Sequence, residues 1–92
     1  MLEKLTKLNK EFDINIVKKA KNIVEKYNII ITQEDGEYYG NSVEMPTVFG
    51  DGKTLDECRE YTKEALVVVV SYLIEQEQKV PISSIKYEKI LN

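Results

Sequence analysis

Five carboxylates lie close together in the middle of the sequence, at Glu34, Asp35, Glu37, Glu44 and Asp51. Grouped carboxylates can bind a divalent cation or divide the roles of general acid and base, as in a metal-dependent hydrolase. The first three crowd an expected hairpin turn, where water surrounds them, so a solvated turn is the simpler interpretation. Glu44 and Asp51 stand near the expected ends of two strands, and we predict that they contact a partner.

Cys58 is the only cysteine, and it falls in the first turn of an expected helix, where a thiolate is favoured. It also lies on the apolar side of that helix, and the chain has no histidine that could activate it. We therefore expect a buried core cysteine and no internal disulfide. The sequence leads us to assign no catalytic residue, no metal ligand and no cofactor.

Two further features could contact a ligand. Tyr38 and Tyr39 could stack on nucleic-acid bases, although paired tyrosines beside a tight turn more often pack across strands. They join Glu44 and Asp51 as predicted partner-binding residues. The Gly-Asp-Gly-Lys-Thr segment at 50–54 resembles a phosphate-binding turn, but it lacks the P-loop spacing, in which four residues separate the outer glycines.

The composition is typical of one folded domain, with 92 residues, of which 42 % are apolar and 32 % charged. We take the domain to span 1–92, with an N-terminal extension over 1–15 and a C-terminal tail over 83–92. Sixteen acidic and thirteen basic residues give a net charge of −3, which favours a basic protein partner over nucleic acid. The lone cysteine and the lack of a signal peptide indicate a cytoplasmic protein, and the longest apolar run, six residues, cannot span a membrane.

Apolar residues spaced by three and four predict two helices in the first third of the chain. Leucines and a phenylalanine with this spacing occupy 1–12, and a second apolar series runs from Ile16 to Tyr27 with lysines on the opposite face. Asp13 or Asn15 would cap the second helix, because a short polar side chain can accept a hydrogen bond from an unpaired N–H of the first turn.

Three short strands are expected next. The β-branched residues of 28–32 predict a strand, and Asp-Gly at 35–36 is a strong signal for a two-residue hairpin turn. Residues 37–43 would form the returning strand, whose alternation places the two adjacent tyrosines on opposite faces. A third strand is expected over 47–49, closed by the glycines that follow.

Thr54 and Glu57 form a capping box that predicts the start of a long helix. Thr54 would accept a hydrogen bond from the N–H of Glu57, and the Glu57 carboxylate would reach back to the N–H of Thr54. We expect the helix to run to about residues 76–78. The four valines that it contains favour a strand by propensity, but the strong cap and the absence of a turn signal favour the helix.

A helix with four consecutive valines should be buried on more than one side, by the sheet or by a second subunit. On this basis Val67, Val68 and Val70 are assigned to a contact between copies, and a homo-oligomer is expected. The thin core of so short a chain would also gain from self-association.

Pro81 ends the helical region, because proline lacks the N–H that a helix needs. In the tail over 82–92, Ile85 and Tyr87 alternate as in a strand, although the apolar spacing leaves a short helix open. The predicted fold class is α+β, with an N-terminal helix, a three-stranded antiparallel meander, a long helix packed on the sheet and a possible fourth strand.

Four short motifs occur in a fixed order in the middle of the chain: Glu-Asp-Gly-Glu-Tyr-Tyr-Gly at 34–40, Val-Glu-Met-Pro at 43–46, Gly-Lys-Thr-Leu-Asp-Glu-Cys at 52–58 and Glu-Ala-Leu at 64–66. In this order and spacing they resemble the HicB-type antitoxin family, whose pattern is a tyrosine-rich hairpin, a Leu-Pro-Gly corner, a Gly-x-Thr helix start and an Ala-Leu helix. Thr47 stands where the family commonly has glycine. The resemblance covers roughly residues 16–82.

The resemblance implies an incomplete ribonuclease-H-like β-β-β-α-β core without nuclease chemistry. Family members neutralise a small mRNA-interferase toxin called HicA, so this chain would sequester a small basic toxin. The middle of the first strand, Ile29 to Ile31, has no carboxylate where a ribonuclease H active site needs one, which favours a binding protein over an enzyme. Many members carry a C-terminal DNA-binding domain, and the eleven residues after Pro81 are too few for one, so direct DNA binding is not expected.

Two other functions stay open from the sequence. The valine run and the small core would suit a stand-alone oligomeric scaffold or regulator with no toxin. A metal-dependent hydrolase would use Glu34, Asp35, Glu44 and Asp51.

Overall fold

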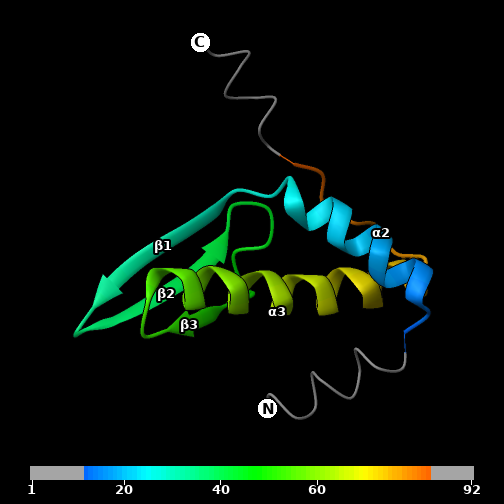
Figure 1. The fold of residues 1–92 in the computed structure, drawn as a ribbon. Coiled ribbons are helices and arrows are strands. Elements are labelled where there is room, and N and C mark those ends of the chain that lie inside the picture. The colour runs from blue at the N-terminus through cyan, green and yellow to red at the C-terminus, as the bar shows by residue number, and fades with distance from the viewer. Residues whose placement is uncertain (1–11, 84–92) are drawn as a thin grey trace.

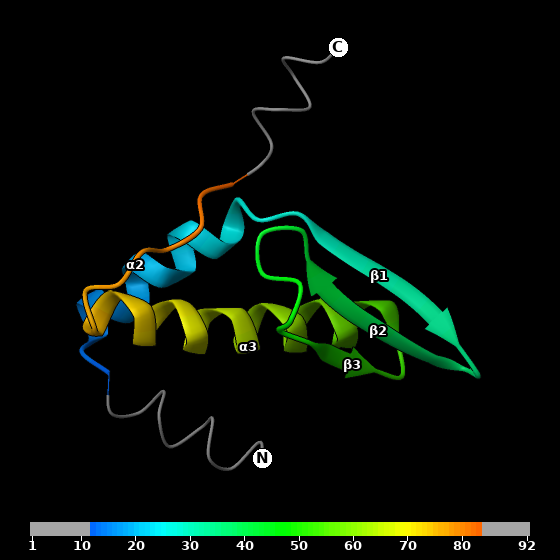
Figure 2. The same cartoon turned by 180° about the vertical axis from the view of Figure 1, so that it is seen from behind.

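The computed structural model describes residues 12–83 and shows an α+β domain with its helices on one side of a small sheet (Figures 1 and 2). The sheet is antiparallel, with three strands in the order β1-β2-β3. The long helix packs on all three strands, and the N-terminal helix packs beside its C-terminal half. The elements are α2 (Ile14–Glu25), β1 (Ile29–Glu34), β2 (Glu37–Ser42), β3 (Gly50–Gly52) and α3 (Leu55–Glu75). The predicted fold class of helix, antiparallel sheet and long packed helix is confirmed.

Helix α2 begins where its cap predicts. The Asp13 carboxylate accepts a hydrogen bond from the backbone N–H of Asn15 at 2.7 Å, so Asp13 is the cap. The buried face of α2 contributes Ala20 and Val24 to the core, where they pack with Leu66 of α3. Neither α2 nor α3 combines the length and the apolarity that a membrane crossing requires.

The β1–β2 hairpin turns at Asp35 and Gly36, whose φ angles are +52° and +78°. Two positive φ values are those of a type I′ turn, which suits the right-handed twist of paired strands. Glu34 and Glu37 face each other next to the turn, and this fixes the register along the hairpin. The predicted hairpin is therefore confirmed, with β1 beginning at Ile29 and extending two residues past the predicted end.

The third strand was predicted over 47–49, and this prediction is wrong: β3 is Gly50–Gly52. The glycines that suggested a turn are the strand itself, because they let the backbone lie directly against α3. A Cβ atom on Gly50 would lie 2.5 Å from the backbone nitrogen of Thr62, and one on Gly52 would lie 2.6 Å from that of Cys58. Only glycine fits at such close approaches.

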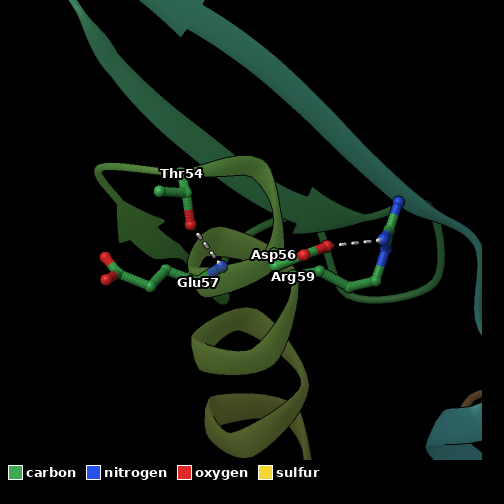
Figure 3. Close-up of polar contacts among 4 residues, drawn as sticks. All are labelled: Thr54, Asp56, Glu57 and Arg59. Atoms are coloured by element: carbon green, nitrogen blue, oxygen red, sulfur yellow. Dashed lines mark hydrogen bonds and ion pairs between the residues drawn. The ribbon is translucent and has the colours of Figure 1, made fainter.

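Helix α3 starts at a cap that differs in one bond from the predicted capping box (Figure 3). The N–H of Glu57 donates to the Thr54 hydroxyl at 3.0 Å, as expected. The Glu57 carboxylate accepts from the N–H of Lys53 at 3.1 Å, one residue earlier than the predicted Thr54. Asp56 and Arg59 form an exposed ion pair at 3.7 Å on the same turn.

The valine run lies inside the single chain. Val67 and Val70 belong to the core that α2 and α3 share, and Val68 is also buried. The sequence assigned these three residues to a contact between copies, because a helix so apolar needs burial on several sides. The chain itself supplies that burial, so these side chains offer no surface for a second copy, and we correct the assignment.

Helix α3 ends at Glu75 with Gln76 as its C-cap, and the chain then turns back along α2 (Figure 2). Glu77 adopts a positive φ of +54°, which ends the helix in the position that glycine more often takes. The returning segment is tied to α2 by hydrogen bonds from the Tyr27 hydroxyl to the Pro81 carbonyl and from the Ser83 hydroxyl to the Lys26 carbonyl, both 2.6 Å long. The helix predicted within 1–12 and the possible fourth strand lie almost entirely outside the described residues.

Candidate partner-binding surface

The sheet has one face against α3 and one face turned away from it. Paired residues of neighbouring strands point to the same face, and residues alternate between faces along each strand. Gly40 and Ser42 are buried on the inner face, as is Gly52 of β3. The outward positions are Ile30, Thr32 and Glu34 of β1, Glu37, Tyr39 and Asn41 of β2, and Asp51 of β3.

Large apolar side chains gather on the outward face. The exposed fractions are 47 % for Ile30, 41 % for Tyr39, 50 % for Val43 and 68 % for Phe49. Val43 and Phe49 continue the outward alternation just beyond the ends of β2 and β3. We call these four residues and Asp51 the outer patch. Single exposed apolar residues are common on proteins, but a contiguous group on one sheet face is typical of an interaction site.

The strand register places the members of the outer patch next to one another. Tyr39 stands directly between Thr32 of β1 and Asp51 of β3. Phe49 is the residue just before β3 and precedes Asp51 by two, so continued strand alternation would place both side chains on the same side of the chain. Ile30 occupies the neighbouring position on β1, two residues before Thr32. The patch thus crosses all three strands.

The loop between β2 and β3 is held in place by hydrogen bonds to β2. The Asn41 side-chain amide donates to the Pro46 carbonyl at 3.1 Å, and the N–H of Met45 donates to the buried Ser42 hydroxyl at 3.0 Å. A further turn bond joins the N–H of Val48 to the Met45 carbonyl at 3.1 Å. These bonds hold the loop between β2 and Val48, so the backbone beside Val43 and Phe49 is braced by the domain itself.

Glu44, predicted as a partner contact, has an internal role in the structure. Its two carboxylate oxygens accept hydrogen bonds from the backbone N–H and the side-chain amide of Asn28, at 3.0 and 3.2 Å. It thereby ties the start of β1 to the β2–β3 loop. Burial and then the nearby Glu44 charge raise the pKa of Tyr27 to about 12.

The structure separates the four predicted partner-binding residues into two pairs. Tyr39 and Asp51 are neighbours on the outer face. Tyr38 is half-buried on the inner face opposite Gly52, and Glu44 bonds Asn28. The sequence reasoning missed Ile30, Val43 and Phe49. Strand alternation could have identified the first two, since they share a face with Tyr39.

The groups that suggested hydrolytic chemistry do not assemble. Glu34 and Asp35 are exposed at the hairpin turn, whereas Asp51 lies on the opposite edge strand. Within residues 12–83, no three His, Cys, Asp or Glu side chains are grouped so that they could hold a metal ion. Cys58 is buried, as predicted, with its Sγ 4.0 Å from the Gly50 carbonyl oxygen.

Comparison with known proteins finds no family model that matches the chain, and no match among curated proteins or solved structures. The resemblance to HicB-type antitoxins therefore rests on the order and spacing of its motifs. Any function of the outer patch must be argued from its own geometry and charge.

Proposed function

We propose that this chain is a protein-binding module of the HicB antitoxin type, which sequesters a small basic toxin of the HicA type through the outer face of its sheet. The observation that carries the proposal is the outer patch, in which four exposed apolar side chains lie with Asp51 on the face of the sheet turned away from α3. A flat apolar surface of this kind gains free energy when a partner covers it.

The charge of the outward face supports a basic partner. The outward positions of the three strands carry three carboxylates, Glu34, Glu37 and Asp51, and no lysine or arginine. The nearest basic residue in the sequence is the exposed Lys53, which follows β3. An apolar centre with acidic neighbours matches a partner that offers apolar and basic groups together, and complementary charge speeds association and selects the partner.

The HicB-like motifs support the proposal because they build this surface. The motif at 34–40 makes the hairpin, the motif at 43–46 makes the braced loop, and the motif at 52–58 begins α3. The glycines that bring β2 and β3 onto α3 fix which side of the sheet remains turned outward.

The test is co-expression with the small basic protein encoded in the neighbouring reading frame, followed by mass measurement of the purified complex and titration calorimetry. We expect a stable complex, which Asp51→Lys and Phe49→Ser each weaken by at least about tenfold. Glu64→Lys makes the same charge reversal on the exposed side of α3 and should leave affinity within about twofold. Glu44→Lys is a poor choice, because it breaks the bonds to Asn28.

Two results would overturn the proposal. The first is the absence of any complex with a toxin-like neighbour under conditions in which both proteins are folded. The second is a complex that the Asp51→Lys and Phe49→Ser variants both form as well as the unmodified chain does, because the partner would then bind elsewhere. Self-association of the pure chain without such a partner would favour the stand-alone scaffold.

A further inference from the structure

We propose that Tyr39, Phe49 and Asp51 form a binding site for an arginine side chain presented by the partner. The identity of the partner rests on the proposed function, but the chemistry of this site rests on the structure alone. We call these three residues the arginine site.

The arginine site combines two aromatic rings with a carboxylate on one face of the sheet. Tyr39 and Asp51 are direct cross-strand partners, which places their Cα atoms about 5 Å apart and their side chains on the same side. Phe49 lies two residues before Asp51, about 7 Å along the same chain. All three side chains are exposed, so a side chain from outside can reach them together.

Arginine fits this combination better than lysine does. A guanidinium group is planar, so it can stack on an aromatic ring while its edge donates two hydrogen bonds to a carboxylate. An ammonium group is a compact, strongly hydrated charge that cannot make both contacts with the same geometry. Burial of the rings by the partner also removes water around the ion pair, which strengthens it.

The surroundings favour a cation at this position. Glu34 and Glu37 are the other titratable groups on the outward face of the strands, and both carry negative charge. Lys53 is the nearest basic residue in sequence. Thr32 stands beside Tyr39 on β1 and offers a hydroxyl that can accept a further hydrogen bond from the guanidinium.

The test uses the full chain labelled with ¹⁵N and two short Gly-Ser peptides that differ only in carrying arginines or lysines at the same positions. Amide chemical shifts are followed as each peptide is added at low salt. We expect the largest shifts at residues 38–40 and 49–52, and several-fold tighter binding of the arginine peptide. Asp51→Asn should weaken binding of the arginine peptide by about tenfold, since it removes a charge-assisted hydrogen bond between the guanidinium and the carboxylate.

Two matched pairs of variants make the result specific. Glu64→Gln removes the same unit of charge from an exposed site on α3 and should change affinity by less than about twofold. Tyr39→Leu should abolish the preference for arginine over lysine, whereas Tyr39→Phe keeps the ring and should retain it. Well-dispersed amide spectra of each variant verify that the domain is folded.

The proposal is overturned if both peptides bind equally, or if Asp51→Asn and Glu64→Gln weaken binding equally, because either result would mean attraction by net charge alone. Failure of the proposed function looks different. If no toxin-like neighbour binds but the arginine peptide binds at residues 38–40 and 49–52, the arginine site stands and the antitoxin role falls. If the complex with the toxin-like neighbour forms and Asp51→Asn changes the affinity of neither that complex nor the peptide, the antitoxin role stands and the arginine site falls.

Discussion

Replacing Gly40 with alanine tests how closely β2 lies on α3. The new Cβ would meet the Thr62 hydroxyl oxygen at less than a contact distance and the Cys58 Sγ at 3.1 Å. Overpacking of this kind costs about 1–3 kcal/mol of the free energy of unfolding. In a domain of this size each kcal/mol lowers the midpoint of thermal unfolding by about 4–8 °C.

The closest obstructing atom is the Thr62 hydroxyl oxygen, so removing it should relieve most of the clash and leave the tight contact with the Cys58 Sγ at 3.1 Å. Thr62→Ala alone should cost about 1–2 kcal/mol, because it removes a buried methyl group and the 2.7 Å hydrogen bond from the hydroxyl to the Cys58 carbonyl. In the double variant the methyl group added at position 40 occupies the vacated space. The losses of unfolding free energy in the two single variants should therefore add up to about 1–2 kcal/mol more than the loss in the double variant.

Gly50→Ala provides the contrast, because its Cβ would meet backbone atoms. The Thr62 backbone nitrogen lies at 2.5 Å and its Cα at 2.6 Å, and Thr62→Ala leaves both in place, although it removes the hydroxyl oxygen, which also lies at 2.5 Å. The combined variant should therefore show no rescue. Gly36→Ala is the control for strain alone, since its φ is +78° and nothing lies within 4 Å of its Cβ; it should cost about 1 kcal/mol, independently of Thr62.

Urea and thermal unfolding, followed by circular dichroism, measure all of these variants. The reasoning is refuted if Thr62→Ala rescues the Gly50 and Gly40 variants equally, or if it rescues neither. Equal rescue would mean that the helix shifts as a body. No rescue at Gly40 would mean that the sheet lies farther from α3 than the structure shows.

Three further outcomes are expected. Burial and Glu44 raise the pKa of Tyr27 to about 12, from 10 in the unfolded chain, so the contribution of this hydroxyl to stability is complete below pH 10 and lost as the pH approaches 12. The free energies of unfolding in urea of the unmodified chain and of Tyr27→Phe should therefore converge over that interval. The Cys58 thiol should react with Ellman's reagent only on unfolding, since it is fully buried. Leu66→Ala should cost about 2–5 kcal/mol and the exposed Leu55→Ala under about 1 kcal/mol in the same unfolding assay.

The elements that could be predicted from the sequence are those set by local chemistry. Asp35 and Gly36 favour one turn type whatever surrounds them, and Thr54 caps α3 through an atom three residues away. The spacing of apolar residues on α2 likewise marks a buried face that the structure confirms at Ala20 and Val24. In each case the interaction spans only a few residues, so it is visible in the sequence.

The features that the sequence did not reveal depend on distant contacts. The glycines of 50–52 are typical of a turn, and only the approach of Thr62 and Cys58 explains why they form a strand. Two of the valines that suggested a second subunit, Val67 and Val70, pack with α2, and the sequence does not show where α2 docks. The bonds of Glu44 to Asn28 join residues sixteen positions apart, so its internal role was equally invisible.

Part of the candidate surface could be predicted, because residue type alone indicated two of its members. Tyr39 and Asp51 were chosen by residue type, and the structure makes them cross-strand neighbours. Phe49 was assigned to a strand, yet its exposure could not be foreseen, because it depends on which face of the sheet α3 covers. Burial patterns in the sequence show that a sheet has an inner face, but the packing of the helix decides which residues that face includes.

The packing of α3 therefore determines where a partner can bind. Gly40, Gly50 and Gly52 line the inner face, and their lack of side chains lets the helix approach so closely that the sheet presses on it over all three strands. Helix α2 adds to this layer by packing on α3, so both described helices stabilise the same side. The apolar side chains at the outward positions of the sheet, Ile30 and Tyr39, are left 47 % and 41 % exposed by this packing. Under the proposed function a second molecule would cover these side chains, and the neighbouring Asp51 would favour a basic one.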